Sequence, residues 1–142
     1  MRKRTLSREI ALKILYAVDI SKEPVEECSR KYWENNDAVD EAVSDFAEYL
    51  ANGVVENLAG LDSLIGKYAD NWQMDRMATV DRNVLRIAAF ELVHCGDTPP
   101  KVAINEAIDM AKKYGDRESG KFVNGILDKL SKTEREETKG KK

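Results

Sequence analysis

Apolar residues recur every three or four positions along most of this chain, and this spacing limits the possible folds more than any other property. Residues 5–20 show the period clearly, with apolar side chains at Ile10, Ala11, Ile14, Leu15 and Val18. This period places apolar groups on one face of an α-helix, whereas a half-buried strand alternates every second residue. Gly and Pro number only 8 and 3 in 142 residues, too few for the turns of a multi-stranded sheet. We therefore predict an all-α protein.

The same period divides the chain into about seven helices packed as a compact bundle. Their expected ranges are 5–20, 24–34, 38–60, 61–72, 79–95, 102–114 and 122–130. Asp37 and Thr79 are expected N-caps, and Gly60 and Gly115 are expected helix stops. The fifth segment is apolar around most of its circumference, so we expect it at the centre of the bundle.

Length and composition indicate one domain without a membrane span. A chain of 142 residues fits a single domain, which we place at residues 1–132. The charged residues 133–142 are expected to form a disordered tail. No apolar run approaches the roughly 20 residues that a spanning helix needs. The basic start lacks the apolar stretch of a secretory signal, so we expect a cytoplasmic protein.

The chain offers little for catalysis or metal binding. Cys28, Cys95 and the single histidine, His94, lack the spacing of a zinc site, and we expect no cofactor and no metal. Residues 115–122 nearly spell a phosphate-binding loop, but Phe122 stands where that loop needs Ser or Thr. Glu91 lies among apolar residues of its helix, and no second carboxylate or nucleophile is recognisable beside it. We interpret it as a structural group rather than a catalytic acid, and predict that the protein is not an enzyme.

Charge is distributed unevenly along the chain, although the net charge is only −3. Residues 1–13 carry five cations and one anion, whereas residues 23–62 carry eleven acids and two bases. Residues 101–142 carry eleven bases and eight acids. This polarity suits a protein with separate binding surfaces for an anion and for a basic partner, although a solvated surface would give the same pattern.

Four segments resemble the NusB family of bacterial antitermination factors. They are SREIALKILYAVD at 7–19, VDRNVLRIAAFEL at 80–92, KVAINEAIDMAK at 101–112 and KFVNGILDKL at 121–130. Their order and spacing make the resemblance specific, and it extends over about residues 4–130. It implies the NusB fold, in which two small helical bundles pack together. It also implies binding of boxA RNA together with NusE, a small-subunit ribosomal protein, within the RNA polymerase antitermination complex, notably on ribosomal RNA operons.

The resemblance assigns candidate RNA-binding residues to both ends of the chain. At the N-terminus, Arg2, Lys3, Arg4 and Arg8 can pair with phosphates; a solvated tail is the alternative interpretation. Elsewhere it points to Tyr68, Lys121 and Phe122, where the two rings would stack on bases of single-stranded RNA. Each ring also flanks an apolar helical stripe, so packing in the core is the alternative for both.

The resemblance also suggests a protein-binding surface and a set of polar contacts. Tyr16 and Asp81, with Asp75 as a further candidate, are expected to face NusE, since acidic groups attract a basic ribosomal protein. Asn105 and Asn124 are expected to bridge helices, and Glu91 is expected to accept hydrogen bonds from backbone N–H groups or from an asparagine such as one of these two. We expect a monomer or a weak homodimer. A protein-interaction module without an RNA role remains the second hypothesis, and an enzyme the third.

Overall fold

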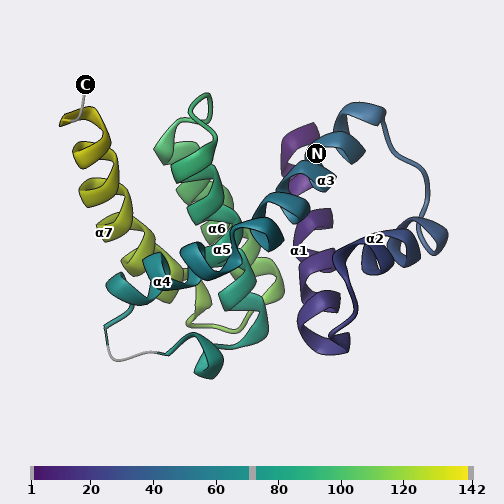
Figure 1. Cartoon of the computed structure of the whole chain (residues 1–142), viewed down its shortest axis with the longest axis horizontal. Coiled ribbons are helices and arrows are strands. Elements are labelled where there is room, and N and C mark those ends of the chain that lie inside the picture. Colours follow the sequence, from purple (N-terminus) through teal and green to yellow (C-terminus); the bar gives the residue numbers. More distant parts are fainter. Residues whose placement is uncertain (1, 71–72, 141–142) are drawn as a thin grey trace.

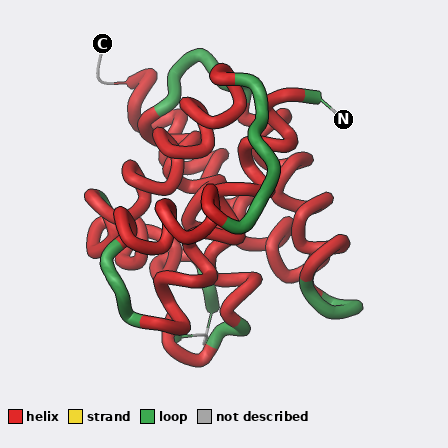
Figure 2. The backbone as a smooth tube through the Cα atoms, turned by 90° about the vertical axis from the view of Figure 1, so that its right-hand side faces the viewer, coloured by secondary structure: helices red, strands yellow, loops and turns green. Residues whose placement is uncertain are grey.

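The structure is a computed structural model that describes residues 2–70 and 73–140, with side chains as far as Glu134. The described residues form seven α-helices, one 3-10 helix and no strand (Figures 1 and 2). The α-helices are α1 (Lys3–Ser21), α2 (Val25–Glu34), α3 (Glu41–Glu56), α4 (Leu58–Tyr68), α5 (Thr79–His94), α6 (Pro100–Tyr114) and α7 (Ser119–Gly140), and the 3-10 helix η1 is Met74–Arg76. The predicted all-α class and the number of helices are confirmed.

Several helix boundaries differ from the prediction, among them those at both ends of α3 and at the start of α5. The third helix begins at Glu41 rather than after Asp37, and the cap of α5 is Ala78 rather than Thr79. The third helix also ends at Asn57, before Gly60, which lies inside α4. The side-chain amide of Asn57 donates to the carbonyl of Gly53 at 2.8 Å, beside the backbone N–H of the same residue at 3.1 Å, so Asn57 caps the end of the helix.

Helix α5 is the centre of the bundle, as its all-round apolar pattern predicts. Every residue from Asn83 to Leu92 is buried, because α5 packs against α1, α3, α4, α6 and α7. Helices α1, α2 and α3 contact one another on one side of α5, and α4, α6 and α7 gather on the other (Figure 1). These groups correspond to the two small bundles expected from the sequence.

A polar cluster joins α1, α4 and α5 at the end of α1. Arg86, which is 6% exposed, donates to Asp62 of α4 at 2.8 Å and to Asp19 of α1 at 3.0 Å. Asp19 also accepts from Arg82 and Asn83. Burial alone would raise the pKa of Asp19, but the Asn83 amide and the two guanidinium groups lower it below its ordinary value. The cluster therefore fixes the end of α1 against the central helix.

Two further regions bear on the expected organisation. Helix α7 extends to Gly140, beyond residue 132, where the sequence predicts that a tail begins; the division into a domain and a tail stays a prediction. Within the described residues, no helix is long and apolar enough to cross a membrane.

The close approach between α3 and α5 depends on a glycine. A Cβ atom at Gly53 would lie 2.2 Å from Cζ of Phe90, whose side chain is 3% exposed, so the ring would have to shift. The absence of a side chain at this position therefore lets the Phe90 ring lie directly against the backbone of α3.

We expect Gly53→Ala to destabilise the protein by about 1–3 kcal/mol, because the added methyl overpacks the contact between α3 and α5. The matched control is Gly125→Ala on α7, where nothing lies within 4 Å of the position that the added methyl would take. It should be neutral or stabilise by up to about 1 kcal/mol, because Ala favours helix over Gly. Urea unfolding followed by circular dichroism measures both. Equal effects of the two changes would contradict the packing assigned to Gly53.

Candidate nucleic-acid interface

The basic start of α1 lies beside the loop that connects α5 to α6. A groove of about 230 Å³ lies there, and its lining residues are Arg2, Arg4, Thr5, Arg8, Asp97, Thr98, Pro99, Val102 and Glu106. Arg4 lies 3.8 Å from the carboxylate of Asp97 and holds its guanidinium 4.3 Å from the ring centre of Phe46. Lys3 pairs with Asp40 at 3.1 Å. Arg2, Lys3 and Arg4 are all exposed, so their charges are available to a phosphate at the rim of the groove.

Arg8 does not belong to this exposed set, and in this respect the prediction is wrong. Its side chain is 3% exposed and donates two hydrogen bonds of 2.8 Å to the carboxylate of Glu91. A third nitrogen lies 3.3 Å from Glu106. Burial would lower the pKa of Arg8, but the bonds and charges of Glu91 and Glu106 raise it, so the guanidinium stays charged. Its donors are already used inside the protein.

The structural interpretation of Glu91 is therefore supported, but its expected partners are not the observed ones. Both carboxylate oxygens accept from Arg8. Asn105 and Asn124 are exposed, so the prediction that they bridge helices and bond to Glu91 is wrong. The sequence contained a signal for the true partner, because a carboxylate on an otherwise apolar helix needs a buried cation. Helix α1 offers Arg8 on the same face as its buried residues.

Lys121 and Phe122 lie in the first turn of α7, beside the later part of α6. Lys121 is exposed and Phe122 is half-buried, so only part of the Phe122 side chain can be reached from solvent. The neighbouring Gly120 faces Ile108 and Lys112 of α6, whereas Arg4 lies near Val102 at the start of α6. Because a helix rises by about 1.5 Å per residue, Ile108 and Lys112 lie about 9–15 Å further along α6 than Val102. The cations and the Phe122 ring therefore flank the same helix without touching.

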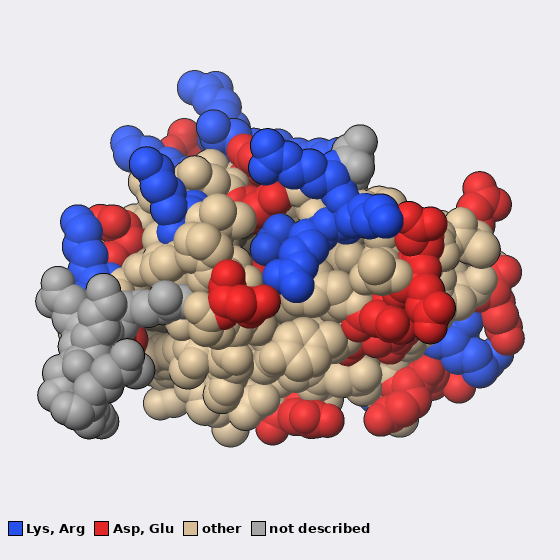
Figure 3. All heavy atoms as spheres, turned by 90° about the horizontal axis from the view of Figure 1, so that it is seen from above, with Lys and Arg blue, Asp and Glu red and all other residues tan. Residues whose placement is uncertain are grey.

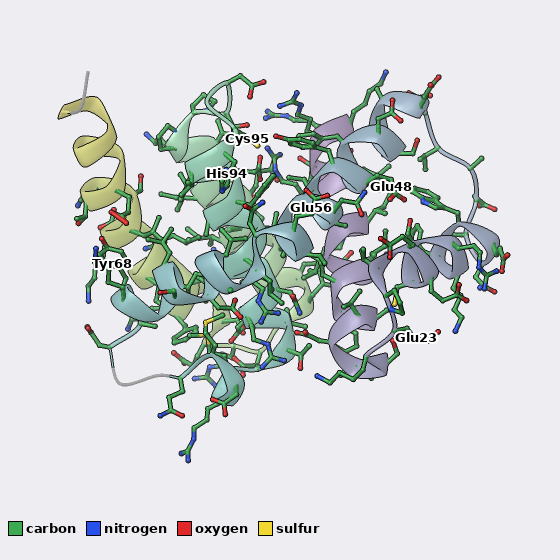
Figure 4. The ribbon with its side chains drawn as sticks, viewed as in Figure 1. Glu23, Glu48, Glu56, Tyr68, His94 and Cys95 are labelled. Atoms are coloured by element: carbon green, nitrogen blue, oxygen red, sulfur yellow. The ribbon has the colours of Figure 1, made fainter. Side chains whose placement is uncertain are left out.

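Tyr68 lies in a different part of the molecule. Tyr68 is the last residue of α4. The residue before it, Lys67, pairs with Glu134 in the later part of α7. In the shared view of Figures 1 and 4, Tyr68 lies toward the end formed by α4 and α7, well away from the start of α1. The ring is half-buried and its hydroxyl is buried. The structure therefore does not bring Tyr68 together with the N-terminal cations.

Two of the three residues expected on the protein-binding surface are exposed. Tyr16 on α1 is 43% exposed, and Asp75 in η1 is also exposed. Arg82 connects their two elements, since it donates to Asp19 and to the carbonyl of Met74. Asp81, by contrast, is 8% exposed, so the prediction that it lies on the open surface is wrong.

The environment of Asp81 explains its burial. It lies at the start of α5 beside Ser119, the first residue of α7. Burial raises its pKa, the nearby charge of Asp116 raises it further, and a hydrogen bond from Ser119 opposes the shift. Its Oδ1 atom is buried without a hydrogen-bond partner, so Asp81 is enclosed where α5 meets α7 rather than presented to solvent.

The surface charge is divided as the sequence indicates. In Figure 3, Lys and Arg side chains gather over the middle of the face, and Asp and Glu side chains gather over the end formed by α2 and the start of α3. The described residues contain no group of three or more His, Cys, Asp or Glu side chains placed to hold a metal ion. The surface thus presents a basic groove and an acidic end.

Comparison with known proteins gives a consistent result. The sequence pattern of the NusB family matches residues 5–132. The chain is 46% identical over 129 residues to the transcription antitermination protein NusB of Anaeromyxobacter dehalogenans (strain 2CP-1 / ATCC BAA-258), covering 91% of this chain and 90% of that protein. It is 45% identical over 130 residues to the same protein of Syntrophus aciditrophicus (strain SB), covering 92% and 80%.

The chain belongs to the NusB family. The structure agrees with that membership. It matches T. maritima NusB with a TM-score of 0.85 and 37% identity, covering 94% of this chain and 92% of that one. It also matches a chain of the complex of antitermination factors NusB and NusE with double-stranded RNA, with a TM-score of 0.85 and 31% identity, covering 93% and 98%. The expected NusB fold is confirmed.

Within this NusB-family scaffold, Arg8 should act on stability rather than on RNA. Arg8→Met leaves Glu91 buried without its cation, and we expect a loss of about 3–5 kcal/mol in the free energy of unfolding. Replacing the pair together, as Arg8→Met with Glu91→Leu, should recover much of that loss, since the buried charge at position 91 is then removed, while Glu106 is partly exposed and still accepts from Thr5. Urea unfolding of the wild type and both variants measures the effect. A double variant no more stable than Arg8→Met would contradict the pairing.

Proposed function

We propose that this protein is a transcription antitermination factor that binds boxA-type nascent RNA together with NusE. In this role it joins the RNA polymerase antitermination complex, notably on ribosomal RNA operons. It acts in the cytoplasm by assembly, not as an enzyme. The observation that carries the RNA part is the groove where Arg2 and Arg4 lie exposed beside the start of α6. Relatives named as antitermination proteins, and a related complex with NusE and RNA, support the proposal.

The RNA surface that we propose extends from this groove along α6 to Lys121 and Phe122. Arg2, Lys3 and Arg4 would neutralise phosphates at one end, because exposed guanidinium and ammonium groups displace counterions from the strand. At the other end, the half-exposed ring of Phe122 would stack on a base, with Lys121 beside it. Tyr68 would take part only if the strand passes round to the side of α4 and α7.

The NusE surface that we propose is formed by Tyr16 and Asp75. The exposed Tyr16 ring would supply apolar contact, and Ile20, which is 61% exposed one turn further along α1, would enlarge it. Asp75 would attract a basic protein. Two partners bound at separate surfaces can raise each other's affinity, so the ternary complex would be tighter than either pair.

The salt dependence of RNA binding tests the first surface. Changing Arg2, Lys3 and Arg4 together to Ala should make the slope of log K against log salt shallower by about 2, because each contact with a single strand contributes about 0.7. A boxA-like single-stranded oligonucleotide, titrated by fluorescence anisotropy at several salt concentrations, measures the slope.

Two controls separate charge from stacking. Arg30→Ala removes an exposed cation of α2 that is paired with Glu27 and Glu34, and it should leave the slope unchanged. Phe122→Leu should weaken binding at every salt concentration without changing the slope, because the ring carries no charge. A wild-type affinity that is absent or independent of salt would favour the interaction module without an RNA role.

A pull-down with purified NusE tests the second surface. Tyr16→Ala should reduce NusE capture at least several-fold, since a truncated aromatic at an interface commonly costs more than about 1 kcal/mol. Adding the boxA-like RNA should raise NusE capture by the wild type and restore part of the capture by the variant. Tyr49→Ala would not serve as a control, because its ring packs on Phe90; Tyr32→Phe on α2 is suitable. NusE capture unaffected by Tyr16→Ala would reject this surface.

A further inference from the structure

A row of aromatic rings continues from Arg4 across α3 to the end of α5. The Arg4 guanidinium lies 4.3 Å from the ring centre of Phe46, and that ring stacks on Tyr49 at 6.1 Å with planes 21° apart. Tyr49 meets Phe90 edge-on at 5.5 Å, and Phe90 stacks on His94 at 5.1 Å with planes 28° apart. The row therefore begins at the basic groove and ends at His94, the last residue of α5.

Two members of this row, Tyr49 and His94, are open to a ligand. Tyr49 is 49% exposed and His94 is exposed, whereas Phe90 between them is buried and forms the floor. Gly53 makes this floor possible, because any side chain there would collide with the Phe90 ring. Tyr49, Phe90 and His94 therefore form a shallow aromatic surface, which we call the aromatic seat, rather than part of a closed core.

Two adjoining hollows mark this seat. One, of about 430 Å³, lies between Tyr49, Phe90 and His94, and the other, of about 410 Å³, continues toward α4. They share Glu56, Asn57 and His94. Figure 4 labels Glu56 on α3 and His94 on α5, so the rim is built from two helices.

The chemistry of the seat fits a nucleobase. Proteins that bind single strands combine cations that follow the backbone with flat side chains on which bases stack. Here Arg4 would meet a phosphate, and Tyr49 and His94 offer flat faces further along the row. Among the described residues that line the two hollows, Glu56 is the one carboxylate. A carboxylate can only accept hydrogen bonds, and guanine presents two adjacent N–H donors on its pairing edge.

We propose that Tyr49, Glu56 and His94 form a second base-binding site, which takes a guanine of an RNA strand whose phosphate lies on Arg4. The inference rests on the proposed RNA-binding function and names a site on α3 and α5, separate from Phe122 on α7. Stacking holds the plane of the base, and the Glu56 carboxylate accepts from the N1–H and N2–H groups of guanine. Asn57 is held by its bond to the Gly53 carbonyl and shapes the rim.

The single histidine of the chain supplies a direct reporter of this site. Its Cε1 proton gives one signal in the proton NMR spectrum of the full-length protein, which needs no further assignment. Titration with a boxA-like single-stranded RNA should shift that signal in step with the binding curve from anisotropy. The same RNA with inosine in place of every guanosine should bind about three- to tenfold more weakly, since inosine lacks the N2 donor.

Three variants separate a direct contact from a structural effect. Glu56→Gln should reduce the difference between the guanosine and inosine strands to less than about twofold, a change that a loss of stability would not produce. Tyr49→Leu keeps an apolar side chain but removes the ring, and should weaken guanosine RNA about fivefold or more. Glu23→Gln, on the loop before α2 and apart from the site in Figure 4, is the matched control and should change neither value.

The outcomes distinguish this site from the proposed function. If the RNA binds with the predicted salt slope but the His94 signal stays still, the second base-binding site is overturned and the proposed function stands. If the His94 signal moves with NusE and not with RNA, the face belongs to a protein partner and the site is again overturned. If no RNA binds at all, both proposals fail.

Discussion

The buried contact between Arg8 and Glu91 holds the functional surface of this protein in place. It joins the first helix to the central helix at 2.8 Å, and Glu106 of α6 completes the charge balance. Because two carboxylates surround one guanidinium, none of the three helices can shift without leaving an ionised group buried. The exposed cations next to Arg8 are therefore presented from a fixed helix, beside the start of α6, rather than from a loose tail.

The same arrangement explains why the molecule can offer several surfaces at once. Helix α5 is enclosed by five others, and each neighbour keeps its outer face for solvent or a partner. The cluster of Asp19, Arg82 and Arg86 holds the far end of α1 as the Arg8 contact holds its start. An assembly factor benefits from this rigidity, since each partner then meets a surface that is already in position.

Much of this fold could be predicted from the sequence, and the places where the prediction was incomplete have a common cause. Helical periodicity is a local property, so the helices and the central place of α5 could be inferred from it. Helix α3 ends at Glu56, where the side chain and the backbone of Asn57 both donate to the Gly53 carbonyl, a cap that no apolar pattern reveals. For the site, Arg2, Lys3 and Arg4 were correctly expected at an open surface, whereas Arg8 and Asp81 were not.

The order of the amino acids was enough to establish the all-helical class, the family and the residue types that could bind RNA, because these follow from periodicity and from local motifs. Which of those residues face solvent was settled by the packing of distant helices. Arg4 and Arg8 lie one turn apart and look alike in the sequence, yet one is half-exposed and the other is enclosed by Glu91 and Glu106. The difference arises because the charge that satisfies Arg8 comes from helices about 80 to 100 residues away, whose approach no local pattern encodes.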